Sequence, residues 1–358
     1  MCIELLLVRG MNRSAALIAI CSAILFGLSA PVAKLLLDTS TPWMLAGILY
    51  CGAGVGLLVV HLAIRGTNVL VEAQLTRREL PWLAATVLSG GVIGPVLLLF
   101  GLVRVNASAA SLLLTLEGVL TAVLAWFVFK ENFDRRIAVG MLSIVAGAVI
   151  LNWQPDATVG DLVGPAAIVG ACLAWALDNN LTRKVSLSDP VQIAMIKGLV
   201  AGPVSLSIGY ALGSAAPPLA TVGLGAVTGF LGYGVSLVLF VIALRHLGTA
   251  RTGAYFSIAP FIGAVVSVPL FGETVTLRLL SAGALMAFGV WLHLSERHEH
   301  DHEHSELAHE HRHTHDEHHD HSHDESADLT QAHSHWHQHR RLRHSHLHTP
   351  DSHHRHPH

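Results

Sequence analysis

Ten long apolar stretches divide this chain, and they restrict its fold more than any other feature. Each has about 17–25 residues, enough for a helix to cross roughly 30 Å of hydrocarbon. Backbone groups inside lipid must form hydrogen bonds within their own segment, so the stretches are predicted to be helices rather than strands. They cover approximately residues 14–37, 42–64, 82–103, 105–129, 137–153, 162–182, 190–212, 219–244, 252–272 and 279–295. The sequence therefore predicts an all-α membrane protein with ten transmembrane helices.

The composition agrees with this prediction. The chain of 358 residues is 52% hydrophobic and 13% charged, and its mean hydropathy is +0.51. A soluble protein of this length needs more charged surface. The sequence contains neither a phosphate-binding loop nor a set of nucleophile and base. An enzymatic activity, a nucleic-acid partner and a required cofactor are therefore not expected.

The two halves of the chain resemble each other. Residues 101–152 align with residues 243–294 at a constant shift of 142, without a gap. The polar matches carry most weight, because apolar coincidences are common in a hydrophobic chain: Glu131 falls on Glu273, and Arg136 falls on Arg278. Internal repeats in a membrane protein are typical of transporters.

Five spans per repeat is an odd number, so the second repeat must cross the membrane in the opposite direction to the first. The predicted fold is therefore two inverted five-helix repeats. The predicted division is an N-terminal cytoplasmic segment at 1–13, a first repeat at 14–153, a second repeat at 161–295 and a tail at 296–358. Met1 and Met11 are both plausible translation starts.

Positive charges in the short loops indicate the orientation. Arg and Lys gather in the loops of one side, for example at Arg77, Arg135, Lys184 and Arg245, and are sparse on the other. By the positive-inside rule, that side is cytoplasmic. Both termini are therefore predicted to lie in the cytoplasm, with the protein in the inner membrane.

Three motifs resemble those of the drug/metabolite transporter superfamily, in its ten-helix EamA-type branch. They are Phe26–Lys34 in the first span, Leu116–Val119 leading to Phe129–Glu131 in the fourth, and Ala259–Pro260 leading to Phe271–Glu273 in the ninth. The resemblance covers residues 14–295. It implies two EamA-like repeats and secondary transport of a small metabolite, commonly export.

Glu117 is the strongest candidate for a functional residue. It lies about twelve residues from either end of the fourth span, too deep for its carboxylate to reach interfacial water. Its repeat mate is Ala259, so the duplicated fold does not require a charge there. The functional hypothesis is a proton-coupling or cation-binding carboxylate in a central cavity. The structural alternative is a hydrogen-bonded glutamate that locks two helices together.

The sixth span contains a polar run, Asp178, Asn179 and Asn180, after Trp175. Neighbouring residues on a helix point about 100° apart, so at least one of the three must face protein or water. These four residues are predicted to contact the substrate. The alternative is that Asp178 pairs with Arg183 or Lys184 near the cytoplasmic surface.

Two lysines are also candidate substrate or coupling residues. Lys197 lies about two turns into the seventh span and either extends to the cytoplasmic interface or forms a buried pair with Glu117 or Asp178. Lys34, near the outer end of the first span, is more typical of an interfacial anchor.

The tail holds most of the 26 histidines of the chain and almost no aliphatic side chains, so it is predicted to be disordered. Imidazole nitrogens bind Zn²⁺, Ni²⁺ and Cu²⁺, and the tail is expected to bind such ions. A pH-sensing role and a solubilising extension are alternatives. The predicted metal ligands are His298, His300, His302, His304, His309, His311, His313, His315, His333, His335, His337 and His339.

Two functions remain open on the sequence alone. The first is a carrier of a small organic metabolite, driven by a proton gradient or by exchange. The second is a divalent-metal efflux carrier that uses the tail to collect its ion. The apolar spans hold few metal-ligating side chains, and this favours the organic substrate. The expected partners are the lipid bilayer and the substrate; a divalent metal and a second copy in a homodimer are left open.

Overall fold

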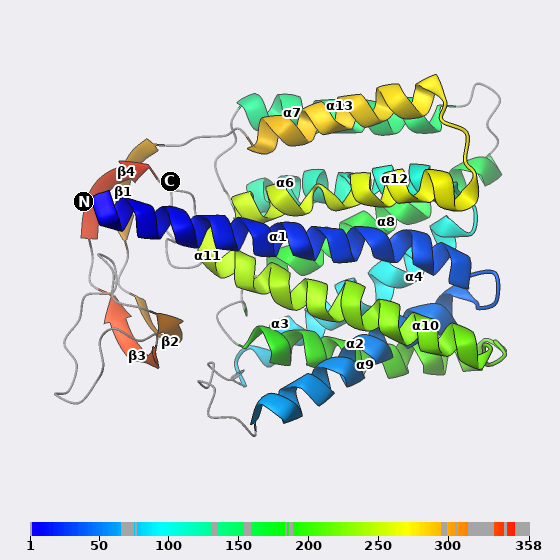
Figure 1. Ribbon diagram of the computed structural model, residues 1–358, viewed down its shortest axis with the longest axis horizontal. Coiled ribbons are helices and arrows are strands. Elements are labelled where there is room, and N and C mark those ends of the chain that lie inside the picture. The colour runs from blue at the N-terminus through cyan, green and yellow to red at the C-terminus, as the bar shows by residue number, and fades with distance from the viewer. Residues whose placement is uncertain are drawn as a thin grey trace.

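The computed structural model describes the backbone of residues 2–65, 75, 77–129, 135–153, 159–182, 185, 189–294, 299–304, 307–313, 333–339 and 342–347. Outside the tail the described chain is almost entirely helical, and the helices run side by side in a bundle (Figure 1).

The elements of the first repeat are α1 (Cys2–Leu36), α2 (Pro42–Arg65), α3 (Leu80–Thr86), the π-helix η1 (Val87–Ile93), α4 (Gly94–Leu102), α5 (Ala107–Leu113), α6 (Leu116–Phe129) and α7 (Arg135–Asn152). Those of the second are α8 (Val159–Thr182), α9 (Pro190–Ala211), α10 (Leu219–Gly229), the π-helix η2 (Phe230–Val235), α11 (Ser236–Phe256), α12 (Ala259–Phe271) and α13 (Leu277–Leu294).

The bundle has two ends, a far end and a tail end (Figure 1). At the far end α1 finishes at Leu36 and α2 begins at Pro42, close to the start of α5 at Ala107. The tail end is opposite and lies beside the N-terminus and the strands of the tail.

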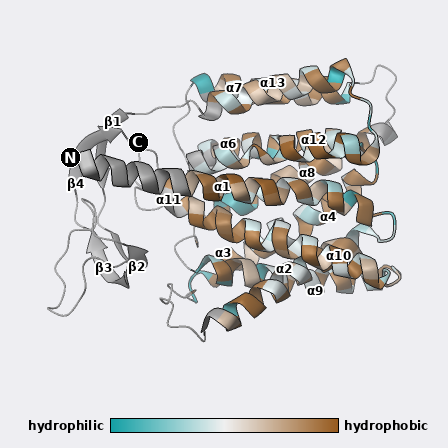
Figure 2. Ribbon diagram, viewed as in Figure 1, coloured by the Kyte–Doolittle hydropathy of each residue, from teal (hydrophilic) through white to brown (hydrophobic). Residues whose placement is uncertain are grey.

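The helices have the length and apolar surface of membrane spans. Seven helical stretches in the described chain are long and apolar enough to cross a membrane, and three shorter apolar helices occupy 138–152, 259–271 and 277–292. Their outer faces expose large apolar side chains such as Leu142 and Val265, and apolar residues dominate the bundle in Figure 2. The predicted set of ten spans is confirmed, and the chain is a multi-pass membrane protein.

The packing follows the inverted duplication. The second spans of the two repeats, α2 and α9, pack against each other, and so do the fifth spans, α7 and α13. In addition, α1 packs on α11 and α12, while its repeat mate α8 packs on the corresponding helices α4 and α6. The first span of each repeat therefore packs against helices of the other repeat, and the two repeats share one bundle.

Irregular backbone recurs at matching places. A shift of 142 residues brings η1 (Val87–Ile93) onto η2 (Phe230–Val235), within one residue. The same shift brings the break between α5 and α6 onto the break between α11 and α12. π-Helical turns and interrupted helices in membrane proteins are frequent beside functional sites, because they free backbone carbonyls. The duplication thus includes four departures from regular helix.

Glycines allow the close approach of α2 to its neighbours. A Cβ built at Gly198 in α9 would lie 2.4 Å from the backbone nitrogen of Gly54, and one at Gly229 would lie 1.9 Å from the carbonyl oxygen of Leu49. No side chain fits at such distances. The backbones therefore pack in direct contact, as expected for small residues between membrane helices.

One region of the bundle differs from the sequence prediction: residues 245–251, predicted as a short loop, are helical within α11.

The described residues of the tail form four strands. β1 (Glu299–His304) pairs with β4 (Leu342–Leu347), and β2 (Leu307–His313) pairs with β3 (His333–His339), both antiparallel. Histidine alternates with other residues there, and this period of two suits a strand. A ladder also satisfies backbone groups without needing aliphatic residues.

Candidate functional site

A cavity lies between the two repeats. The first repeat contributes to it from α1, α2 and α6, and the second from α8, α9, η2 and α11. The lining residues are Phe26, Tyr50, Glu117, Trp175, Asp178, Asn179, Lys197, Gly232, Tyr233, Ser236, Leu237, Phe240 and Phe256. A mostly apolar wall with a few polar side chains is typical of sites that bind small organic molecules.

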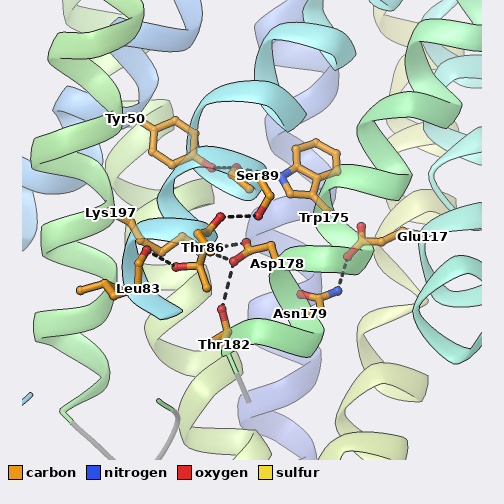
Figure 3. A network of polar contacts seen from close by, with 12 residues as sticks. Tyr50, Leu83, Thr86, Ser89, Glu117, Trp175, Asp178, Asn179, Thr182 and Lys197 are labelled. Atoms are coloured by element: carbon orange, nitrogen blue, oxygen red, sulfur yellow. Dashed lines mark hydrogen bonds and ion pairs between the residues drawn. The ribbon is translucent and has the colours of Figure 1, made fainter. Parts of the chain in front are cut away.

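Glu117 enters this cavity from the first turn of α6, directly after the break that separates α5 from α6. Helix N-termini carry a partial positive charge and unpaired N–H groups, so this position suits a carboxylate better than the middle of a helix does. The Nδ2 of Asn179 donates a hydrogen bond to Glu117 Oε1 over 2.8 Å (Figure 3). Glu117 forms no salt bridge within the described part of the chain.

Asp178 forms a buried ion pair with Lys197 across α8 and α9. Lys197 Nζ lies 2.8 Å from Asp178 Oδ1 and 2.6 Å from Oδ2, and Thr182 Oγ1 donates a third hydrogen bond over 3.0 Å (Figure 3). Only 6% of Asp178 and 2% of Lys197 is exposed. The lysine neutralises this carboxylate, as a buried charge requires.

Because α8 is a helix, the side chains of its consecutive polar residues 178–180 point in different directions. Asp178 points toward α9, while the adjacent Asn179 reaches Glu117 on α6 (Figure 3). Asn180 does not line the cavity: its Nδ2 donates to the carbonyls of Ala176, over 2.8 Å, and Thr121, over 3.3 Å. Asp178 and Asn179 are therefore cavity residues, whereas Asn180 joins two helices.

The π-helix η1 supplies a backbone acceptor at the cavity wall. The carbonyl of Gly90 accepts hydrogen bonds from Tyr50 Oη, at 2.7 Å, and from Trp175 Nε1, at 3.1 Å. A Cβ at Gly90 would lie 1.9 Å from Asp178 Oδ2, so only glycine lets η1 approach the ion pair. Both polar aromatic groups and the ion pair thus depend on this one turn.

Aromatic rings form most of the remaining wall. Phe26 contacts Trp175, Tyr233 and Phe256, with ring centroids 5.2–5.8 Å apart. Further contacts join Tyr50 to Tyr233 and Phe240 to Phe256, so the six rings form one continuous cluster. Most pairs are tilted or edge-to-face, the arrangements that aromatic quadrupoles favour.

A second polar cluster closes the far end of the bundle, and we call Lys34, Ser108 and Glu273 the far-end clasp. Glu273 accepts hydrogen bonds from the backbone nitrogens of Ala107, at 2.8 Å, and Ser108, at 3.2 Å, and from the Ser108 hydroxyl. Lys34 Nζ donates to the carbonyls of Leu102, over 2.9 Å, and Val105. The clasp therefore fixes the turn between α4 and α5 to both repeats.

The family model for "EamA-like transporter family" matches residues 13–153 and again residues 162–295. The chain belongs to this family. The two matches correspond to the two halves seen in the sequence and in the fold.

Relatives of this EamA-like protein carry transporter names. An uncharacterized transporter of Methanothermobacter thermautotrophicus is 28% identical over 76% of this chain and 84% of its own length. A probable 4-amino-4-deoxy-L-arabinose-phosphoundecaprenol flippase subunit, ArnE of Pseudomonas aeruginosa, is 44% identical over 21% of this chain and 64% of its own length. A solved crystal structure aligns over 79% of this chain and 98% of its own with a TM-score of 0.62; at 18% identity it shows the fold alone.

The structure of the EamA-like transporter brings five of the seven predicted core residues together. Glu117, Trp175, Asp178, Asn179 and Lys197 all line the cavity. The two others, Asn180 and Lys34, lie in the helix contact and in the far-end clasp described above. Of the two predicted partners of Lys197, the structure has Asp178; Arg183 and Lys184, considered as partners of Asp178, lie outside the described residues.

Sequence reasoning missed the aromatic lining. Tyr50 and Tyr233 are two of only four tyrosines in the chain, and both lie well inside apolar spans. Tyrosines of membrane proteins usually gather at the interfaces, because the hydroxyl needs a polar partner. Their depth was the signal that could have identified them.

The metal ligands of the tail stay a prediction. His298 and His315 lie outside the described residues, and the other ten histidines fall in strands β1, β2 and β3, whose side-chain positions are not described. Among the described side chains of the bundle, no group of three or more His, Cys, Asp or Glu is placed to hold a metal ion.

Proposed function

We propose that this EamA-like protein is a secondary carrier that moves a small organic metabolite across the cytoplasmic membrane by alternating access. The observation that carries the proposal is the cavity between two inverted repeats, which combines one ion pair, one further carboxylate and an aromatic wall. Carriers built from inverted repeats bind their substrate at this boundary, and rocking of one repeat against the other exposes it to each side in turn.

In this proposal Glu117 couples transport to protons. Its carboxylate lies in the cavity with one neutral partner, Asn179, and can therefore gain or lose a proton without breaking an ion pair. Asp178, bound to Lys197, is the fixed charge of the site. Glu117 would take up a proton on one side of the membrane and release it on the other. We therefore propose that the carrier exports its substrate in exchange for protons.

The far-end clasp is proposed as the closed gate on the outer side. The positive loops of the sequence put the tail end in the cytoplasm, so the far end faces outward. Opening would break the hydrogen bonds that α5 donates to Glu273 and those that Lys34 donates to the turn before α5. Labelling of cysteines placed within 130–136 and 153–161 should reach the two sets from opposite sides of the membrane; labelling from one side would exclude this arrangement.

A metal-efflux carrier is the weaker candidate. A path for a divalent ion needs several converging ligands, and in the cavity one of the two carboxylates is already bound to Lys197. The histidine tail is the main support for metal efflux. For the tail we propose a cytoplasmic store of Zn²⁺, Ni²⁺ or Cu²⁺.

The test is solute-driven proton movement in proteoliposomes. The purified full chain is reconstituted with a trapped pH-sensitive dye and presented with amines, amino acids, sugars and nucleosides in turn. We expect at least one class to move protons, and Glu117→Gln to abolish that movement while the variant still elutes as a folded protein. Equal proton movement by the native chain and the variant would remove Glu117 from the coupling.

A further inference from the structure

The cavity has an unbalanced charge, and this bears on which solutes it can hold. Lys197 is engaged with both oxygens of Asp178, so the pair is neutral as a unit. Glu117 has the Asn179 amide on one oxygen and no cationic partner within the described chain. With Glu117 ionised, the described lining carries a net negative charge. In surroundings of low dielectric constant, a ligand of positive charge is attracted and an anion is repelled.

The aromatic cluster favours the same sign of charge. Phe26, Tyr233, Phe240 and Phe256 surround the space that Glu117 faces. Aromatic faces attract cations through the ring quadrupole, most strongly where water is excluded. The rings also accept an apolar body, which leaves the cation as the part of the ligand that needs specific contacts.

Few hydrogen-bonding groups of the wall remain for a ligand. The polar hydrogens of Tyr50 and Trp175 are used on the carbonyl of Gly90, and Ser236 exchanges hydrogen bonds with Ser22. A polyhydroxylated solute would leave many of its own groups unpaired, at a cost of about 1–3 kcal/mol each.

Tyr233 is the exception. It is 6% exposed, and its hydroxyl has no hydrogen-bond partner in the described part of the structure. The Ser29 hydroxyl donates its proton to the carbonyl of Phe26 over 2.6 Å, so it does not donate to the Tyr233 oxygen. A buried hydroxyl without a partner is costly, so a polar group of a ligand is its natural partner.

We propose that the cavity selects organic cations, in which an ammonium or comparable group is carried on an apolar body. The cation lies between the Glu117 carboxylate and the aromatic rings, and its N–H groups, where present, donate to Glu117 and to the Tyr233 oxygen. This substrate class rests on the proposed function, in that it assigns a ligand to the cavity of the carrier.

Binding of matched probes tests this selectivity without requiring flux. The probes are benzyltrimethylammonium, its neutral carbon isostere neopentylbenzene, and benzenesulfonate as the anion. Equilibrium dialysis is done on the full chain in nanodiscs, with binding to empty nanodiscs subtracted. We expect the cation to bind at least about tenfold more tightly than either other probe.

Two variants separate the contributions. Glu117→Gln keeps the size of the side chain, and should reduce the preference for the cation over the isostere to less than about threefold. Phe240→Leu removes a ring that makes no polar contact in the described structure, and should weaken binding of the cation several-fold while changing the isostere by less than about twofold. If Glu117→Gln fails to fold, Phe240→Leu and the comparison with benzenesulfonate still decide whether the cavity prefers cations.

Equal affinity of the native chain for cation and isostere would overturn the proposal, and so would an unchanged preference in Glu117→Gln. Failure of the proposed function looks different. Cation binding without proton-coupled flux would uphold the selectivity and reject the carrier, whereas coupled flux of a neutral or anionic solute would do the reverse.

Discussion

Removal of Lys197 is the perturbation for which the structure gives the largest and best-defined effect. Lys197→Met keeps the length of the side chain but leaves Asp178 buried with a charge, and within the described chain only the Thr182 hydroxyl remains as its side-chain partner. Breaking a buried ion pair from one side costs about 3–5 kcal/mol, because the remaining charge is uncompensated. The variant should therefore lose about this much free energy of unfolding.

The partner variant and the double variant complete a thermodynamic cycle. Asp178→Asn leaves the lysine unpaired and should also be strongly destabilising. In the double variant neither charge remains, so its loss should be smaller than the sum of the two single losses by about 2 kcal/mol or more. Lys34→Met is a matched control. That lysine is half-buried, and in the described structure it donates only to backbone carbonyls, so a loss of about 1–2 kcal/mol is expected.

Unfolding of the full chain in mixed micelles, followed by circular dichroism as SDS is increased, measures these differences. All variants share the same lipid-like surroundings, so the differences report on the pair itself. A loss below about 1 kcal/mol for Lys197→Met, or additive losses in the cycle, would refute the reasoning. Either result would mean that Asp178 is neutral or solvated in the folded protein.

Three further predictions follow from the glycine, clasp and tail geometry. Gly90→Ala should cost about 1–3 kcal/mol in the same assay, because its Cβ would overlap Asp178, whereas Gly223→Ala, with nothing within 4 Å, should be neutral within about 0.5 kcal/mol. Glu273→Gln should weaken the far-end clasp; a membrane-impermeant maleimide should then label Ser111→Cys several-fold faster in a background without other cysteines, and an unchanged rate would contradict the gate. Deletion of residues 297–358 should leave solute-driven proton movement unchanged, and loss of growth in excess Ni²⁺ or Zn²⁺ would instead favour the metal-efflux alternative.

The sequence was sufficient for the spans because membrane burial imposes length and apolarity on each segment separately. The sequence also indicated Glu117 and Lys197, which both line the cavity, because an ionisable residue deep in an apolar run is rare and costly. These signals are local, and each can be read without knowing which helices are neighbours.

Contacts between distant segments left no such signal. Glu273 stood out as a repeat match, but its partners Ala107 and Ser108 are 166 and 165 residues away. The π-helices η1 and η2 were likewise missed, because one extra residue in a helical turn changes neither composition nor length appreciably. The strands of the tail were not predicted either, although the alternation of histidine with other residues suits extended backbone.

Comparison of the two repeats separates residues that the shared fold requires from residues that are present only at the cavity. Phe26 and Trp175 occupy matching places in the first spans of the two repeats, at a shift of 149, and both line the cavity. At that shift the mate of Asp178 is Ser29, and at a shift of 142 the mate of Glu117 is Ala259.

The five-helix fold is thus present twice, whereas Glu117 and Asp178 each have an uncharged residue at the matching place of the other repeat. Ser29 and Ala259 are both buried in the same fold, so the repeat packs well without a charge at either place. Burying two carboxylates and the lysine that compensates one of them costs free energy that an uncharged copy avoids. Each carboxylate imposes this cost in one repeat, whereas its mate in the other repeat is uncharged, and folding alone does not explain the difference. This is the strongest reason to look for the substrate and the coupling ion beside Glu117 and Asp178.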